Sequence, residues 1–167
     1  MPLRKLVLDR LLRAAADVRR NAYAPYSRFP VGAAVLASGR VHAACNVENV
    51  SFPLCVCAER NAVAMAVAAG TQRIEAVAVV GGSARPTAPC GGCRQVLAEF
   101  AAADAPVVYA TPGGEAIATT VGALLPSAFA SGDLKAAARG STRSPAAPSP
   151  GKARSAARAR ASRTSGR

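Results

Sequence analysis

The sequence predicts an α/β fold, a three-layer α/β/α sandwich around a mixed five-stranded sheet. Three features carry this prediction. Two apolar segments, residues 31–37 and 41–47, flank a turn signal at Gly39 and indicate a β-hairpin. Helical and strand-like segments alternate after the hairpin. Residues 74–80 form a nearly unbroken apolar run, which is typical of a strand covered on both faces.

Local patterns predict the remaining elements. A first helix over residues 3–20 precedes the hairpin, and its apolar stripe consists of Leu8, Leu11, Leu12, Ala15 and Ala16. A second helix over residues 58–69 is rich in helix formers and stops at Gly70. The later elements are a helix at 94–102 that starts at Cys93, strands at 106–110 and 115–119, and a helical turn at 121–125.

Three cysteines have the spacing that a metal site needs. Cys90 and Cys93 form a Cys-x-x-Cys pair with two glycines between them, so both sulfurs can reach one metal ion. Cys57 stands at the start of the second predicted helix, where the helix N-terminus favours a thiolate over a thiol. Three thiolates would hold a zinc ion and leave its fourth ligand position for water, whereas a structural site usually has a fourth protein ligand.

Two side chains beside Cys57 suit catalysis at such a site. Glu59 is not needed as a ligand, and its carboxylate can take a proton from the activated water and deliver protons to a substrate. Arg60 shares a helical face with Cys57, where its charge would reduce electron donation from the thiolates to zinc. By itself, the Cys-x-x-Cys pair is equally typical of a redox pair or half of a structural zinc site, and Arg60 of a solvated helix face.

Six motifs carry a resemblance to a known family: residues 23–27 (YAPYS), 29–34 (FPVGAA), 45–49 (CNVEN), 57–60 (CAER), 89–96 (PCGGCRQV) and 124–129 (LLPSAF). From about Leu6 to Phe129 the chain resembles the short, homotetrameric, three-cysteine class of cytidine deaminases. The resemblance implies hydrolytic deamination of cytidine and deoxycytidine to uridine and deoxyuridine with release of ammonia, in pyrimidine salvage. It also implies one zinc ion per subunit, bound by Cys57, Cys90 and Cys93.

The resemblance further implies roles for five residues around the substrate. Asn46 and Glu48 would hold the ribose, and their spacing of two on a predicted strand places them on the same side. Phe29 would pack against the pyrimidine, and the backbone N–H of Ala58 would bind the ring carbonyl. Phe129 would reach the pocket of a neighbouring subunit, so the sites of the homotetramer would be shared. Taken singly, these residues are typical of a turn, a surface charge and two core aromatics.

The chain departs from the family pattern at several positions. Phe52 stands where the family often has Tyr, which removes a hydroxyl group near the sugar, and Pro53 stiffens that loop. Cys45 and Cys55 are additional thiols that we expect to be buried as small hydrophobic residues, with Cys55 the weaker alternative as a metal ligand. The single histidine, His42, lies outside the zinc motifs.

The net charge of +12 is concentrated at one end of the chain. Residues 138–167 contain eight basic side chains and no acidic ones, so subtracting 8 from 12 leaves +4 for residues 1–137. We expect residues 1–137 to be the catalytic domain and residues 138–167 to be a disordered basic tail of Ala, Arg, Ser, Pro and Gly. The tail has no aromatic side chain for base stacking, so we expect no nucleic-acid binding beyond a weak contact through it.

The sequence also bears on location. It contains no run of 18 apolar residues and no signal-peptide pattern, and its cysteines are needed as thiolates. We therefore expect a cytoplasmic protein without membrane contact.

Three other functions fit part of the pattern. A small zinc deaminase acting on blasticidin S shares the Cys-Ala-Glu and Pro-Cys-x-x-Cys-Arg-Gln motifs, although Asn46 and Glu48 favour a nucleoside. A polynucleotide deaminase needs an open channel, and residues 1–137 have no long basic insertion that would line one. A zinc-stabilised binding module without turnover has no need of Glu59.

Overall fold

The computed structural model describes residues 2–140, which belong to two units, Met1–Phe129 and Ala130–Arg167. The first unit contains, in chain order, α1 (Pro2–Arg19), β1 (Gly32–Ala37), β2 (Arg40–Cys45), the 3₁₀ turn η1 (Phe52–Leu54), α2 (Ala58–Ala68), β3 (Ala76–Val80), α3 (Gly91–Phe100), β4 (Pro106–Ala110), β5 (Ala116–Thr120) and α4 (Val121–Leu124). The second unit contributes α5 (Ser131–Gly140).

The five strands form one mixed sheet in the order β2-β1-β3-β4-β5. β1 is antiparallel to β2 and β3, β3 is parallel to β4, and β4 is antiparallel to β5. The parallel pair requires a crossover, which α3 supplies. Because Gly32 pairs with Val80, the start of β1 and the end of β3 lie at the same edge of the sheet.

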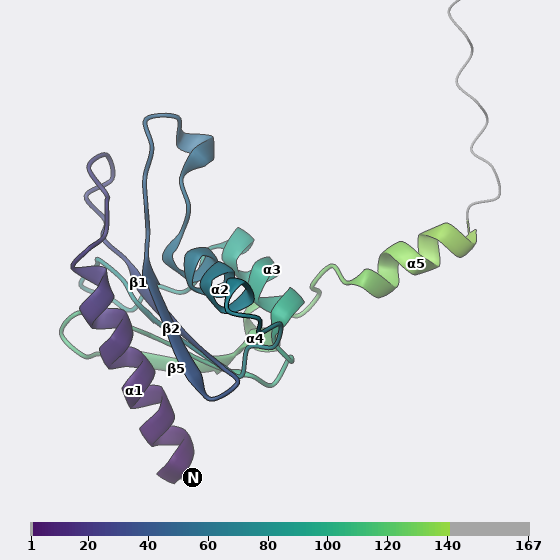
Figure 1. The fold of residues 1–167 in the computed structure, drawn as a ribbon, viewed down its shortest axis with the longest axis horizontal. Helices are drawn as coiled ribbons and strands as arrows, with labels where there is room; N and C mark the ends of the chain where they lie inside the picture. Colours follow the sequence, from purple (N-terminus) through teal and green to yellow (C-terminus); the bar gives the residue numbers. More distant parts are fainter. Residues whose placement is uncertain (1, 141–167) are drawn as a thin grey trace, which may run out of the picture. The chain divides into compact units, whose positions relative to one another are not determined.

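Helices cover both faces of this sheet, so the predicted three-layer sandwich is confirmed (Figure 1). On one face, Leu11 and Ala15 of α1 pack with Ala34, Ala78 and Val108. On the other face, α2 and α3 enclose a second cluster that includes Val35, Val77, Val79, Val107 and Leu97. Alternate residues of β1 and β3 belong to opposite clusters, as the two-residue period of a strand requires. All five residues of β3 are buried, which confirms the strand covered on both faces.

The first layer depends on a close approach at Gly32. A Cβ atom added there would lie 2.0 Å from the carbonyl oxygen of Ala15 and 2.8 Å from the Cβ of Arg19. The missing side chain therefore lets α1 lie directly on the start of β1. The cavity described below opens at this same edge of the sheet, next to the start of β1.

The main differences from the predicted elements have local causes. The third helix begins at Gly91 rather than at Arg94, because Cys90 takes the N-cap position and its carbonyl accepts from Arg94 N–H at 3.0 Å. The strand expected over residues 74–80 starts at Ala76, and Ile74 instead forms an isolated bridge with Ala101. Ala16 is exposed, although the apolar stripe of the first helix was expected to include it.

The two additional thiols are half-buried, so the expectation that both are buried is wrong. Cys45 ends β2. Cys55 follows η1, where its Sγ accepts from the Asn49 N–H at 3.3 Å and contacts the Asn49 carbonyl at 3.5 Å. The segment around η1 projects away from the sheet, which explains why Cys55 has few neighbours to bury it (Figure 1).

The helix α5, which follows the first unit in the sequence, was not predicted. It carries Asp133 in its first turn, and this carboxylate accepts from the Ala130 N–H at 2.8 Å. The helix includes residues 138–140, the first three of the expected disordered tail. Residues 141–167, which make up the rest of that tail, lie outside the described part of the chain. Within the described residues, no helix is long and apolar enough to cross a membrane.

Candidate active site

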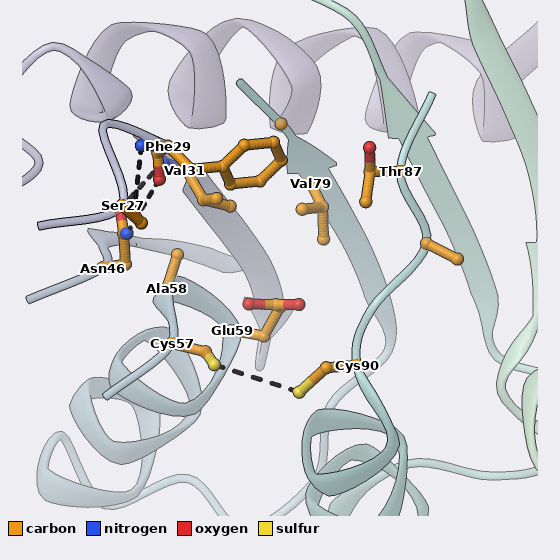
Figure 2. A pocket seen from close by; sticks show the side chains of 12 residues that line it. Ser27, Phe29, Val31, Asn46, Cys57, Ala58, Glu59, Val79, Thr87 and Cys90 are labelled. Carbon is orange, nitrogen blue, oxygen red and sulfur yellow. Dashed lines mark hydrogen bonds between the residues drawn. The ribbon is translucent and has the colours of Figure 1, made fainter. Parts of the chain in front are cut away.

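Two helix N-termini bring the three predicted metal ligands together. Cys57 is the N-cap of α2 and Cys90 the N-cap of α3, and Cys93 lies in the first turn of α3. Neither N-cap side chain forms a capping hydrogen bond with the backbone of its helix, so both sulfurs are free to face the other cysteines. Figure 2 shows the Cys57 and Cys90 sulfurs facing each other from the two helix ends. The partial positive charge of each helix end favours thiolates there.

The sulfur atoms have the spacing of a tetrahedral zinc site. Cys57 Sγ lies 3.9 Å from Cys90 Sγ, and Cys90 Sγ lies 3.4 Å from Cys93 Sγ. All three sulfurs lie within 4.8 Å of one another. Four ligands at a Zn–S distance of about 2.3 Å in tetrahedral geometry are about 3.8 Å apart, so the observed distances fit one zinc ion. Among the described residues, this is the one such cluster of His, Cys, Asp or Glu side chains.

The pKa values of Cys57 and Cys93 depend on each other. Hydrogen bonding from Cys93, with smaller contributions from Cys90 and the charge of Arg60, lowers the pKa of Cys57 to about 6, although burial opposes the shift. The same hydrogen bond to Cys57, together with burial, raises the pKa of Cys93 well above its ordinary 9.0. The cluster thus holds a first negative charge readily and resists further ones until a cation is bound.

Glu59 places a carboxyl group beside the sulfurs. It is only 5% exposed, and it is one of two polar residues in the buried set, with Thr111. Burial raises the pKa of Glu59 above its ordinary 4.5, and the negative charge of Cys57 adds to the shift, while its own backbone N–H opposes it. A carboxyl group with a raised pKa accepts and returns protons more readily near neutral pH.

A cavity of about 350 Å³ opens between the two helix ends and the edge of the sheet. Glu59, Cys57 and Cys90 form one end, and Figure 2 shows the Glu59 carboxylate directed into the space above the sulfurs. The remaining wall is mainly apolar, with these residues: Ser27, Phe29, Val31, Asn46, Ala58, Val79, Gly81, Thr87 and Ala88. As the first residue of α2, Ala58 has a backbone N–H without an acceptor inside the helix.

Asn46 and Glu48 hold the loop that carries Phe29. The Asn46 Oδ1 accepts from the Val31 N–H at 2.8 Å, and its Nδ2 donates to the Phe29 carbonyl at 3.0 Å. The Glu48 carboxylate accepts from the backbone N–H groups of Tyr26 and Ser27 at 2.9 and 3.2 Å. Both side chains therefore have a structural task in addition to the predicted one.

Comparison with known proteins decides which family has this site. The family model of the cytidine and deoxycytidylate deaminase zinc-binding region matches residues 7–111. The chain belongs to this deaminase family. A cytidine deaminase of Sporosarcina psychrophila is 44% identical over 132 residues, covering 78% of this chain and 97% of the relative. The cytidine deaminase of Mycobacterium tuberculosis strain H37Rv is 42% identical over 121 residues, covering 72% and 87%.

Solved cytidine deaminase structures share the fold. The enzyme of Burkholderia pseudomallei matches with a TM-score of 0.70 and 48% identity, covering 72% of this chain and 98% of that one. The enzyme of Mycobacterium leprae matches with a TM-score of 0.61 and 41% identity, covering 71% and 96%. These matches confirm both the predicted family and the predicted fold class.

The structure brings six of the ten predicted site residues to the lining of one cavity, and four do not line it. Cys93 is buried in the metal cluster beside the cavity. Glu48 does not line the cavity and lies behind Ser27. Arg60 is exposed and acts on Cys57 only through its charge. Phe129 is 58% exposed and does not line the cavity of its own chain. Gln95 holds the backbone of Phe129 in place: its Nε2 donates to the Phe129 carbonyl at 2.8 Å, and its Oε1 accepts from the Phe129 N–H at 3.3 Å.

Sequence reasoning missed several residues of this deaminase site. Ser27 and Thr87 line the cavity, and Arg94 supports the metal turn by donating to the Pro89 carbonyl at 2.7 Å and the Leu124 carbonyl at 3.1 Å. Ser27 and Arg94 belong to motifs that carried the family resemblance, so the motifs themselves were the available signal. Thr87 lies in a loop without such a motif, and the sequence contains no comparable signal for it.

Proposed function

We propose that this chain catalyses the hydrolytic deamination of cytidine and deoxycytidine to uridine and deoxyuridine, with release of ammonia. The observation that carries the proposal is the buried Glu59 carboxyl group, which lines a cavity together with Cys57 and Cys90, two members of a three-cysteine cluster at zinc-site spacing. The cytidine deaminase relatives support the choice of substrate.

Cys57, Cys90 and Cys93 would hold one zinc ion per chain. The bound ion would act as a Lewis acid that lowers the pKa of a water molecule in the cavity. Arg60 would offset part of the negative charge of the thiolates, since its charge already lowers the pKa of Cys57. The Arg60→Ala variant should then shift the onset of activity to higher pH.

Glu59 would move the protons of the reaction. The oxygen of one water molecule forms a bond to C4 of the pyrimidine, the C4–N bond breaks, and the amino nitrogen leaves as ammonia. Glu59 takes the first proton of the water and gives it to N3, and then carries the second proton to the leaving nitrogen. Its raised pKa suits both the uptake and the release of protons.

The other cavity residues would orient the nucleoside. Phe29 would pack against the pyrimidine ring, and the free N–H of Ala58 would donate to the ring carbonyl. Asn46 keeps one N–H and one lone pair beyond its loop contacts, and these could bind the sugar. Glu48 would accept from a sugar hydroxyl group.

Phe129 would complete the site of a neighbouring subunit in a homotetramer. Its side chain is exposed and does not line the cavity of its own chain, while Gln95 holds its backbone. An isolated subunit would then bind zinc but turn over poorly. A role in pyrimidine salvage and a cytoplasmic location belong to the same proposal.

The test combines zinc stoichiometry with an ultraviolet assay of cytidine turnover on one purified sample. We expect about one zinc ion per chain and conversion of cytidine. The Glu59→Gln variant should keep its zinc and lose about 10² to 10⁴ in kcat, because it retains the shape of the side chain without its proton transfer. The matched control is Glu99→Gln, which changes an exposed carboxylate of α3.

Alternative functions predict different results in the same assay. Full zinc loading without ammonia release from any cytosine nucleoside would leave a zinc-binding module. Preference for blasticidin S over cytidine would indicate the related small-molecule deaminase. Preference for single-stranded DNA over free deoxycytidine would indicate a polynucleotide deaminase.

A further inference from the structure

The carboxylate of Glu48 is almost fully occupied by one turn of the chain. Its Oε2 accepts from the backbone N–H groups of Tyr26 and Ser27, at 2.9 and 3.2 Å. Its Oε1 accepts from the hydroxyl group of Ser27. A carboxylate offers about four lone-pair positions, two on each oxygen, so a single position on Oε1 remains free.

Ser27 stands between this carboxylate and the cavity. Ser27 lines the cavity and Glu48 does not. The Ser27 hydroxyl group donates to Glu48 and accepts from the Phe29 N–H at 3.1 Å, which leaves one lone pair on Oγ. Figure 2 places Ser27 beside Asn46 on the wall opposite Thr87. This wall therefore provides acceptors, among them the free lone pair of Ser27 Oγ, for a hydroxyl group that enters the cavity.

The hydrogen bonds also lower the pKa of Glu48 below its ordinary 4.5. The Ser27 hydroxyl group makes the largest contribution, and the N–H groups of Tyr26 and Ser27 add to it. The carboxylate is therefore ionised at neutral pH, and an ionised acceptor forms a stronger hydrogen bond with a hydroxyl group than a neutral one does.

We propose that Ser27 is a positioning residue that fixes the Glu48 carboxylate with one free lone pair and so makes the site selective for nucleosides with a hydroxyl group on the sugar ring. The proposal rests on the proposed nucleoside deaminase function. It adds that recognition of this hydroxyl group by Glu48 depends on Ser27, which lies in a different segment of the chain.

If Ser27 had only a structural role, its loss would affect the position of Phe29 rather than that of Glu48. The Ser27 hydroxyl group also accepts from Phe29, so its loss could disturb the pyrimidine wall. However, Asn46 holds Phe29 and Val31 independently through two further hydrogen bonds. We therefore expect Phe29 to stay in place without the Ser27 hydroxyl group, while Glu48 Oε1 loses its restraint.

The experiment compares two substrates that differ in the sugar. In Ser27→Ala, kcat/KM for cytidine should fall about tenfold or more, mainly through KM, because a hydrogen bond to a charged group is lost. For 2′,3′-dideoxycytidine, which lacks the hydroxyl group, kcat/KM should change less than about twofold. Ser27→Thr retains the hydroxyl group and should restore discrimination. The matched control is Ser51→Ala, because Ser51 starts η1 without a side-chain cap.

Binding without turnover provides the second readout. Calorimetric titration with uridine and 2′,3′-dideoxyuridine should show the same loss of discrimination in Ser27→Ala, with zinc content and melting temperature close to those of the wild type. Equal losses for both members of a pair, or no loss for either, would overturn the proposal. A wild type that binds uridine but does not deaminate cytidine would contradict the proposed function, and the titrations would then decide the role of Ser27.

Discussion

Replacement of Asn46 by alanine tests whether this side chain supports the fold as well as the substrate. The change removes the hydrogen bond from the Val31 N–H at 2.8 Å and the one to the Phe29 carbonyl at 3.0 Å. Each such bond contributes about 1 kcal/mol, so the variant should lose about 2 kcal/mol of unfolding free energy. A residue that binds only the sugar would lose activity without this loss of stability.

The assay is urea denaturation of the zinc-loaded protein at one fixed protein concentration. With an m-value of roughly 2 kcal/mol/M, the midpoint should fall by about 1 M. Asn46→Asp keeps the acceptor for Val31 but places an oxygen opposite the Phe29 carbonyl, so it should lose at least about 1 kcal/mol. Asn21→Ala is the control, because Asn21 is exposed and makes no side-chain hydrogen bond among the described residues.

The reasoning is wrong if Asn46→Ala unfolds at the same urea concentration as the wild type. It is also wrong if Asn46→Ala discriminates against 2′,3′-dideoxycytidine as the wild type does and has an unchanged kcat/KM for cytidine. The first result would remove the structural task of Asn46, and the second would remove its place beside the substrate.

Three further predictions concern the metal, the inter-subunit aromatic and the α1 contact. Zinc affinity should rise with pH, and it should decline more steeply below about pH 6, because zinc must displace the proton of Cys93, whose pKa is raised, over this whole range and must also displace the proton of Cys57 below about 6. Gln95→Leu should lower kcat/KM without lowering zinc content, since Gln95 holds the backbone of Phe129, while Gln72→Leu in an exposed loop should change neither. Gly32→Ala should destabilise the protein by about 2 kcal/mol or more, because its Cβ would overlap the backbone of α1.

Each of these predictions has a result that contradicts it. A pH dependence of zinc affinity that does not become steeper below about pH 6 would mean that Cys57 is not a ligand. A Gln95→Leu variant with wild-type kinetics would separate Phe129 from the active site. Gly132→Ala, where the added Cβ has open space, is the control for Gly32→Ala, and equal melting temperatures of the two variants would refute the packing argument.

Local signals in the sequence were enough for the elements and the metal site. Helix formers, turn residues and apolar runs placed nearly every helix and strand within a few residues of its observed bounds. The metal ligands were predictable because each lies at the N-terminus of a helix that its own segment encodes, and because two of them share one short turn. The short helix α5 and the turn η1 were not predicted, since η1 is only three residues long and α5 runs into the segment that was expected to be disordered.

Long-range contacts decided the rest. No local pattern shows that β1 lies between β2 and β3, because strand order depends on which surfaces two helices can cover together. The double use of Asn46 and the distance of Glu48 from the cavity also arise from pairing with a loop about twenty residues earlier. The sequence by itself determined which chemical groups this deaminase has and which helix ends carry its sulfurs. Only the tertiary structure decided which of those groups face the substrate, because hydrogen bonds between distant segments had already used some of their donors and acceptors.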